Sequence, residues 1–344
     1  MAGRLKLRRG VVVSADPLEV EVQGERRRAW ADEVLLGGMH EGDAVIVNVA
    51  AADLGLGSGG FDVVHVNLTR GLEGGGDADA HVMKLNYTSL QHPVDPVERP
   101  NSRFLGPDMQ DKGTTRSTPV AVLPLHGHLA PAAWAARQAR PGLRVGYVQT
   151  GGGALPGSLS RDVKQLRDRG LLAGQITAAP AYGGEYEALS TAGALDAAAN
   201  VLDWDAILVG PGPGIIGSDT HYGHGGMTAL DNAHAALSLG MPTLISPRLS
   251  SSDPRPRHQG LSHHTRTVLQ LLLAPVEVAI PVGEPEVAAA LGPFRHHLKQ
   301  VAVDLEGYAA AGLPDTTMGR SLEEDPLFFA AALAAGRLLA DRVA

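Results

Sequence analysis

The hydrophobic pattern of the chain changes near residue 120. Before this point, β-branched or alternating segments of four to six residues are separated by turn-forming glycine, proline and aspartate residues. These segments cover residues 10–14, 19–22, 45–49, 63–66 and 82–87. Five short strands without a convincing helix predict a small antiparallel β-barrel of the OB or SH3-like kind, which we assign to a domain over residues 1–95.

From residue 120 onward, short apolar runs alternate with longer segments of helical periodicity. We predict strands at 120–123, 145–148, 176–179, 206–209, 243–245, 276–280 and 301–303. Helices are predicted between them at 132–138, 160–169, 185–201, 228–239, 265–273 and 286–298. This alternation predicts the α/β class, with a doubly wound, mostly parallel sheet over residues 119–344. Residues 96–118 lack hydrophobic periodicity and are predicted to be a linker or surface loop.

The last predicted element is a strongly apolar helix over residues 321–343. Ser321 and Glu324 have the S-x-x-E spacing of a capping box, which marks the start of a helix. Because so apolar a helix needs a partner surface, we expect it to dock on one of the two domains or on a second subunit. A homo-oligomer is therefore expected.

Composition excludes several classes of function. A length of 344 residues suits two domains, and a net charge of −8 disfavours broad binding to a phosphate backbone, so no nucleic-acid partner is expected. The absence of cysteine excludes disulfides, thiolate catalysis and cysteine-ligated zinc. The chain begins without the apolar segment of a signal peptide, and its apolar runs are too short to span a bilayer. We expect a cytoplasmic protein with no membrane partner.

Ligands of parallel sheets bind beyond the carboxyl ends of the strands, so the residues that follow each strand are informative. The strand at 145–148 is followed by Gly151, Gly152 and Gly153, and then by Ser158. A strand, a glycine loop and a hydroxyl at a helix start direct backbone N–H groups toward an anion. The loop ends without the lysine of a Walker A sequence, and a plain tight turn is an equal alternative.

A second glycine-rich loop follows the strand at 206–209. Residues 212–217, which include Gly212 and Gly214, match G-x-G-x-x-G. Two features argue against a dinucleotide site: further loop residues precede the next helix, and no acidic residue ends the next strand. The same loop carries Asp219, His221 and His224, which we regard as candidates for proton transfer or for binding a divalent metal.

The strand at 243–245 is followed by a proline-rich segment with arginines and histidines that leads into a helix. Arginine offers paired donors to phosphate or carboxylate, so this segment is predicted to clamp an anion. His263 is also a candidate for catalysis. The residues are Arg248, Arg255, Arg257, His258, His263 and His264.

A His-x-His pair, His126 and His128, follows the strand at 120–123. Two imidazoles at this spacing are able to share one metal ion, as in some metallohydrolases. The simpler interpretation is that a histidine caps the helix predicted to begin nearby.

Several segments together resemble an uncharacterised bacterial family, the domain of unknown function 3866 family. They are residues 53–60, 81–88, 210–217, 246–248 with 262–265, and 324–329. The resemblance runs in order over essentially the whole chain. It implies a single evolutionary unit that includes the N-terminal part, and it implies no activity, because the family has no assigned substrate, cofactor or catalytic residue.

Three functional hypotheses follow. The first is an enzyme, a hydrolase or transferase, that acts on an anionic small molecule carrying a phosphate or carboxylate, with a divalent metal as a candidate cofactor. The second is a ligand-binding or regulatory module whose barrel recruits a partner; Trp30, Phe61 and Tyr87 are its only predicted stacking aromatics. The third is an NADP-type dinucleotide-binding protein in which Arg248 takes the 2′-phosphate, although its spacing is too long.

Overall fold

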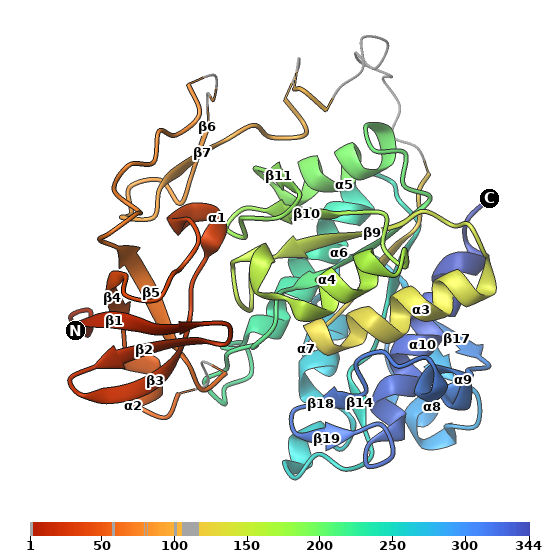
Figure 1. The fold of residues 1–344 in the computed structure, drawn as a ribbon. Coiled ribbons are helices and arrows are strands. Elements are labelled where there is room, and N and C mark those ends of the chain that lie inside the picture. Colours follow the sequence, from red (N-terminus) through yellow and green to blue (C-terminus); the bar gives the residue numbers. More distant parts are fainter. Residues whose placement is uncertain (1–2, 57–58, 79, 81, 100–101, 105–116) are drawn as a thin grey trace. The chain divides into compact units, whose positions relative to one another are not determined.

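The computed structural model describes residues 3–56, 59–78, 80, 82–99, 102–104 and 117–344 (Figure 1). The chain divides into two compact units, Met1–Pro93 and Val94–Ala344. The first contains a closed barrel of five strands and the second an eight-stranded parallel sheet with helices, so the predicted α/β class and architecture are confirmed. Among the described residues, each helix is too short or too polar to cross a lipid bilayer.

The barrel closes in the strand order β1-β2-β3-β5-β4. Its strands are β1 (Leu7–Ala15), β2 (Leu18–Val22), β3 (Glu25–Trp30), β4 (Ala44–Asn48) and β5 (Asp62–Asn67). All neighbouring strands are antiparallel except β3 and β5, which gives the Greek-key barrel of the OB kind. Valines at alternate positions of β2 and β4 point inward and form the core: Val20, Val22, Val45 and Val47.

The prediction placed the fifth barrel strand wrongly. Residues 82–87 were expected to complete the barrel, but β6 (Val82–Lys84) forms a separate two-stranded sheet with β7 (His92–Val94). The strand that was not predicted is β3, whose sequence is Glu-Arg-Arg-Arg-Ala-Trp. Its four consecutive charged residues conceal the alternation of apolar and polar positions that is typical of a strand. Arg26 pairs with Glu19, and Arg27 pairs with Asp62 at 2.6 Å, so acidic neighbours in the barrel offset this basic strand. Two one-turn helices, α1 (Glu33–Leu36) and α2 (Ala50–Asp53), were also not predicted.

The second unit contains one sheet whose strands are all parallel, in the order β11-β10-β9-β12-β8-β13-β16-β17. Its strands are β8 (Val120–Val122), β9 (Val145–Thr150), β10 (Gln175–Ala178), β11 (Tyr186–Ala188), β12 (Ala206–Pro211), β13 (Thr243–Ile245), β16 (Glu277–Pro281) and β17 (His297–Val301). The central strands are continuous apolar runs because both faces of the sheet are covered.

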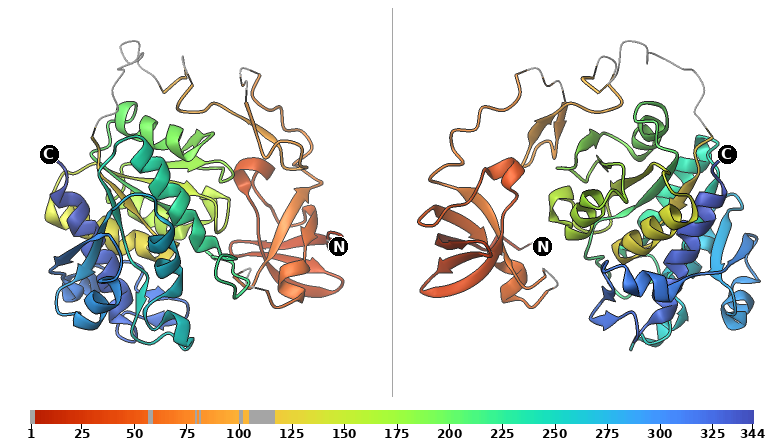
Figure 2. Two further views of the ribbon diagram at one scale, coloured as in Figure 1. Left: turned by 180° about the vertical axis from the view of Figure 1, so that it is seen from behind. Right: turned by 45° about the vertical axis from the view of Figure 1, so that its right-hand side comes forward.

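Helices cover the sheet on both faces (Figure 2). One face carries α3 (Leu129–Ala139), α4 (Arg161–Asp168), α9 (Leu305–Ala310) and α10 (Pro326–Asp341). The other carries α5 (Thr191–Asn200), α6 (Thr228–Ser238), α7 (His263–Leu271) and α8 (Pro285–Leu291). Alternate residues at β8 belong to the two cores: Val120 and Val122 to the core on the side of α6, and Ala121 and the following Leu123 to the core on the side of α10.

The helix α10 fills a face that the crossovers leave open. The connections between β12, β13, β16 and β17 run through α6, α7 and α8, which all lie on one side of the sheet. The opposite side of β13, β16 and β17 is covered by α10, which packs along α3 and is buried over most of its length (Figure 1). This explains why α10 is apolar nearly all round, and it shows docking within its own domain.

The predicted capping box forms, but it does not start the helix. The Ser321 backbone N–H donates to Glu324 Oε2 at 2.7 Å, and the Glu324 N–H donates to Ser321 Oγ at 3.2 Å. These bonds close the turn before α10, which begins at Pro326 rather than at residue 321. The N-cap residue is Asp325, whose side chain is engaged elsewhere.

The other errors lie at the two edges of the sheet. Residues 185–201 were predicted as one helix, but the segment begins with the edge strand β11. Residues 286–298 were predicted as helix and 301–303 as strand; in fact α8 ends at Leu291 and the opposite edge strand is β17. Part of the predicted linker packs on this sheet, since Val97 is buried and its N–H donates to Glu187 O at 2.8 Å. Residues 105–116 of that linker lie outside the described residues.

The contact between α10 and α3 depends on Gly336. A Cβ atom at this position would lie 2.0 Å from the Ala132 carbonyl oxygen. We expect Gly336→Val to lower the free energy of unfolding by at least about 2 kcal/mol, because the helices have to move apart. The neighbouring Arg337→Ala, at an exposed side chain, should cost less than about 1 kcal/mol. Urea unfolding followed by circular dichroism measures both, and equal stabilities would contradict the packing described.

Candidate functional site

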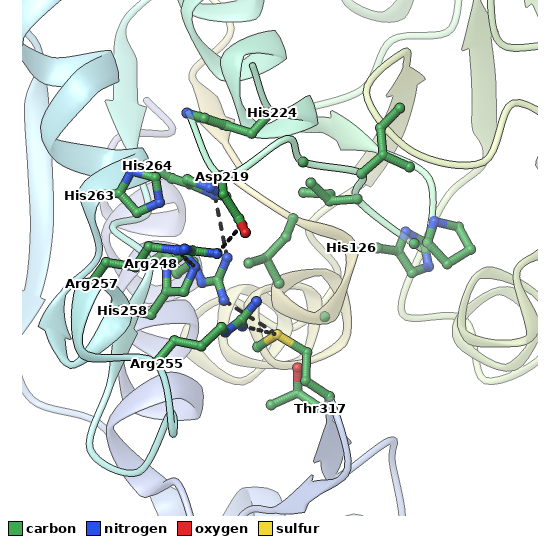
Figure 3. A pocket seen from close by; sticks show the side chains of 18 of the residues that line it. His126, Asp219, His224, Arg248, Arg255, Arg257, His258, His263, His264 and Thr317 are labelled. Atoms are coloured by element: carbon green, nitrogen blue, oxygen red, sulfur yellow. Dashed lines mark hydrogen bonds and ion pairs between the residues drawn. The ribbon is translucent and has the colours of Figure 1, made fainter. Parts of the chain in front are cut away.

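A pocket of about 530 Å³ lies where the direction of the crossovers reverses (Figure 3). The chain leaves β8 toward β9 on one side of the sheet and leaves β12 toward β13 on the other, and such a switch point opens a crevice beyond the carboxyl ends of the strands. The lining comes from residues 125–127 after β8, 213–224 after β12 and 248–264 after β13, with residues 316–318 and Asp162.

The pocket collects most of the candidate residues. The predicted residues that line it are His126, Gly214, Asp219, His224, Arg248, Arg255, Arg257, His258, His263 and His264. The predicted residues that do not line it are His128, Gly151, Gly152, Gly153, Ser158, Gly212 and His221. The segments after β12 and β13 therefore meet, and the glycine loop after β9 has a different place.

The loop after β9 packs against the loop after β12. A Cβ atom on Gly152 would lie 2.4 Å from Gly225 O, and one on Gly153 would lie 2.2 Å from Gly212 O. The Ala154 N–H donates to Pro213 O at 2.7 Å. These glycines therefore allow two backbones to pack together, which fixes the position of the loop after β12.

Ser158 lines a separate hollow of about 510 Å³ together with Lys164 and Arg167. The N-cap of α4 is Ser160, whose hydroxyl accepts a hydrogen bond from the Val163 N–H at 3.1 Å. Ser158 therefore does not line the pocket at the switch point.

The glycine pattern at 212–217 does not open a helix. It leads into a hairpin-like turn in which Gly217 bridges His224 and the Ser218 N–H donates to Gly223 O at 2.7 Å. Asp219 has a left-handed backbone (φ 60°) within this turn, and its carboxylate pairs with Arg257. His221 lies outside the pocket, where its Nε2 is 3.4 Å from Thr267 Oγ1.

The segment after β13 is folded back on itself by a short antiparallel pair, β14 (Leu249–Ser250) and β15 (Gly260–Leu261). The Ser262 N–H donates to Arg248 O at 3.0 Å, which closes the base of this loop. The loop therefore presents Arg255, Arg257 and His258 to the pocket, and the first turn of α7 follows with His263 and His264.

A fully buried carboxylate, Asp253, holds the arginines in place. It contacts Arg248 Nη2 at 3.2 Å, Arg255 Nε and Nη2 at 2.9 Å each, and Arg320 Nη2 at 3.5 Å. Burial opposes ionisation of Asp253, but the hydrogen bonds from Arg255 hold its pKa well below the usual value. Burial lowers the pKa of Arg248 to about 10, so this side chain stays protonated at neutral pH.

A second buried carboxylate, Asp325, connects α10 to the same loop. It accepts hydrogen bonds from Ser250 Oγ at 2.6 Å and from the Ser251 N–H at 2.8 Å. Arg320 donates to it at 3.1 Å. Charged hydrogen bonds thus join three segments: the start of α10, the residues just before it and the loop after β13.

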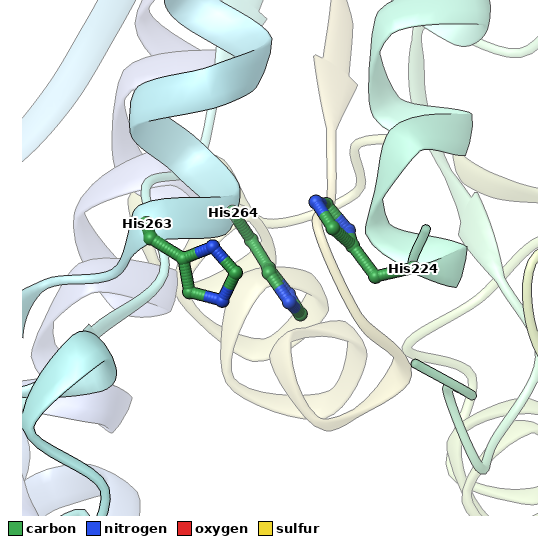
Figure 4. Close-up of side chains that lie close together, drawn as sticks. All are labelled: His224, His263 and His264. Carbon is green, nitrogen blue, oxygen red and sulfur yellow. The ribbon is translucent and has the colours of Figure 1, made fainter. Parts of the chain in front are cut away.

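Four histidines form one cluster at a wall of the pocket, and three of them are drawn in Figure 4. The His224 and His264 rings stack with centroids 3.6 Å apart, and the His258 ring lies 4.9 Å from both His263 and His264. Burial, with nearby positive charge, lowers the pKa of His224 to about 4, of His258 to about 3 and of His264 to about 2. These imidazoles are therefore neutral at pH 7.

Several polar atoms of this wall are buried without a hydrogen-bond partner among the described residues. They are Nε2 of His263, Nε of Arg248 and the ring nitrogens of His224, which make only a weak contact with the His221 backbone. A buried polar group without a partner costs about 1–3 kcal/mol. Unpaired groups of this kind gathered at a cavity are typical of a binding site rather than of a folded core.

The His-x-His pair is divided between two environments. His126 Nε2 lies 2.7 Å from Ser160 Oγ and its Nδ1 lies 3.3 Å from Pro211 O. His128 is buried, with Nδ1 2.8 Å from Ser246 Oγ. The two imidazoles serve different partners, and the metal-ligand group found among the described residues consists instead of His224, His263 and His264.

The strand pair β18 (Thr316–Thr317) and β19 (Arg320–Ser321) was not predicted from the sequence. Its turn residues, Met318 and Gly319, both have positive φ, as in a type I′ turn, and Thr316 to Met318 line the pocket. The x-Gly pair between two short polar segments was the available signal. Asp162, in the first turn of α4, was missed because nothing in its spacing connects it to the other segments.

The model of one protein family, described as a protein of unknown function (DUF3866), matches residues 28–336. The match extends from β3 of the barrel into α10, so the chain belongs to this family and the resemblance noted in the sequence is confirmed. No curated protein matches the chain, and no solved structure matches it.

Asp253 is expected to be essential for stability. Asp253→Ala leaves Arg248 buried without its counter-charge and should lower the free energy of unfolding by about 3–5 kcal/mol. Asp219→Ala removes the exposed partner of Arg257 and should cost less than about 1 kcal/mol. Urea unfolding compares the two, with Asp253→Asn as a milder variant. Similar small losses would refute the organising role of Asp253.

The stability of the domain should fall in acid partly because of His128. Burial lowers the pKa of His128 to about 3, so between this value and the usual pKa near 6.5 the unfolded chain binds the proton and the folded chain does not. The contribution of the neutral His128 to the free energy of unfolding is fully present above pH about 6.5. It declines, by up to about 1.4 kcal/mol per pH unit, as the pH falls below this value.

In urea unfolding at several pH values between 7 and 5, His128→Asn should flatten this decline. Ser246→Ala, which removes the hydrogen-bond partner but keeps the imidazole, should retain it. An equally steep decline in His128→Asn and in the unmodified protein would contradict the assignment.

Proposed function

We propose that this member of the DUF3866 family is an enzyme, a hydrolase or a transferase, that acts on a small anionic substrate carrying a phosphate or carboxylate. The observation that carries the proposal is one pocket in which arginines, neutral histidines and unpaired buried donors from two separate loops lie together. Pockets that combine such groups with shifted pKa values are typical of catalytic sites.

The arginines are suited to bind an anion in two ways. Arg257 and Arg255 keep about two fifths of their side chains exposed, at 38% and 45%. The partner of Arg257, Asp219, is 75% exposed, so a substrate oxyanion can replace it at little cost. Arg255 uses Nε and Nη2 to bind Asp253, which fixes the guanidinium with its remaining edge available to a ligand.

The histidines are suited to move protons. A neutral imidazole accepts a proton from water or from a substrate hydroxyl. His224 and His263 line the pocket, and Nε2 of His263 has no partner among the described residues. In the proposed reaction the arginines hold the anionic group while a histidine activates the attacking oxygen. Redox chemistry with a dinucleotide fits less well, because the 212–217 loop leads into a turn and offers no helix N-terminus to a pyrophosphate.

The proposal predicts that Arg257 is needed for binding. A thermal-shift screen of phosphorylated and carboxylated metabolites should give compounds that raise the melting temperature, and titration calorimetry should then show affinity at least about tenfold weaker in Arg257→Gln. Arg337→Gln, at an exposed arginine of α10 outside the pocket, is the matched control and should bind normally. Chemical turnover of each hit is followed by mass spectrometry.

Two results would remove the proposal. One is a screen in which no anion shifts the melting temperature of either chelator-treated or zinc-supplemented protein. The other is equal anion affinity in Arg257→Gln and Arg337→Gln.

A further inference from the structure

Three histidine side chains at the pocket wall have the arrangement of a metal-binding group. Each of His224, His263 and His264 offers one ring nitrogen, and these nitrogens all lie within 4.8 Å of one another (Figure 4). His224 ends the turn after β12, and the other two begin α7, so the group joins the two loops that form the pocket. A tetrahedral ion with Zn–N bonds of about 2.0 Å requires nitrogens about 3.3 Å apart, which side-chain rotation from the stacked arrangement can supply.

The environment favours a metal ligand over a structural histidine. Nε2 of His263 is buried without a hydrogen-bond partner among the described residues, and the ring nitrogens of His224 make only a weak contact with the His221 backbone. His126 satisfies both nitrogens with Ser160 and Pro211, and His128 leaves one nitrogen unpaired, so the cluster differs from these two in gathering several such nitrogens at a cavity. Gly226 lies against two of the rings, and a Cβ atom there would be 3.0 Å from His224 Nδ1 and 3.2 Å from His264 Nδ1.

The charged side chains at the pocket are largely compensated. Arg248, Arg255 and Arg257 line it together with Asp162 and Asp219. The fully buried Asp253, which is not part of the lining, pairs with Arg248 and Arg255, and Arg320 pairs with Asp325. A divalent ion at the histidines would therefore add positive charge that favours an anion.

We infer that His224, His263 and His264 bind one divalent transition-metal ion, of the zinc class, and that this ion forms part of the anion site. Binding of the metal ion to the three histidines is independent of the proposed function. The participation of this ion in anion binding rests on the proposed function. Three imidazoles with a fourth position open toward the pocket are the donor set of catalytic zinc sites. An ion in this place would polarise a bound oxyanion or activate a water molecule beside Arg257. With the ion bound, it would replace the histidines in activating the attacking oxygen, because a ligating nitrogen has no lone pair left to accept a proton.

The test uses the full chain, purified without a His tag and stripped with a chelator. Equilibrium dialysis against Zn²⁺ with elemental analysis should give one ion per chain, and Co²⁺ should give the visible absorption of a tetrahedral nitrogen site. His263→Asn and His264→Asn should each weaken Zn²⁺ binding at least about tenfold. His221→Asn is the matched control, because His221 is near this cluster but outside the pocket, and it should bind as the unmodified protein does.

The possible outcomes separate the two proposals. Absence of stoichiometric Zn²⁺ binding, or equal binding by His263→Asn and His221→Asn, overturns the metal site and leaves the Arg257 test of the anion proposal standing. Circular dichroism shows whether each variant is folded, and His224→Gln serves as a third variant if one of the others is not.

Coupling between the two ligands is measured with inorganic phosphate, whose affinity should rise at least about tenfold when Zn²⁺ is bound, because one ligand increases the affinity for the other. An unchanged phosphate affinity overturns the role of the ion in the anion site.

Discussion

The carboxylate of Asp253 is the interaction on which the site depends. It is fully buried and is contacted by three arginines that come from different parts of the segment 248–320. Placing a carboxylate and guanidinium groups out of water is costly unless each finds a partner at hydrogen-bond distance. The loop after β13 and the residues before α10 are therefore held together, and Arg255 and His258 keep their places at the pocket.

This arrangement also limits what the arginines do. Arg248 lines the pocket, but it is almost fully buried and its charge is compensated by Asp253, whereas the acidic partner of Arg257 is exposed. Abundant arginine thus does not by itself make a strongly positive cavity. In our proposal a metal ion at the unpaired histidine nitrogens beside it supplies further positive charge, because neutral imidazoles are common ligands of transition metals in proteins. The fold, the charge pattern and the histidine cluster then describe one site.

Much of the fold could be predicted from periodicity, and the failures have a common cause. The central strands β8, β9 and β12 are buried on both faces, so their apolar runs are conspicuous. The strands that were missed or misplaced, β3, β11 and β17, carry charged or polar residues. Two of them are the edges of the parallel sheet, where one side of the strand is open and the hydrophobic signal is weak.

The candidate site was predictable to the extent that parallel strands end at the same edge of a sheet. That rule brought together the segments 213–224 and 248–264. It failed for Gly151 to Gly153, since a glycine loop that packs against another backbone has the same sequence as one that receives an anion. It could not reveal Asp253 as the hub of the arginines, because the partners of a buried charge are fixed by tertiary packing.

The central claim is that the loops after β12 and β13 form one site that binds a substrate anion and a divalent metal ion. Crystals of zinc-loaded protein soaked in tungstate test it directly, because both elements are located by anomalous diffraction. The account predicts a zinc peak bonded to His224, His263 and His264, with tungstate between this peak and Arg257. Zinc and tungstate peaks elsewhere on the molecule, with this pocket empty, would contradict it.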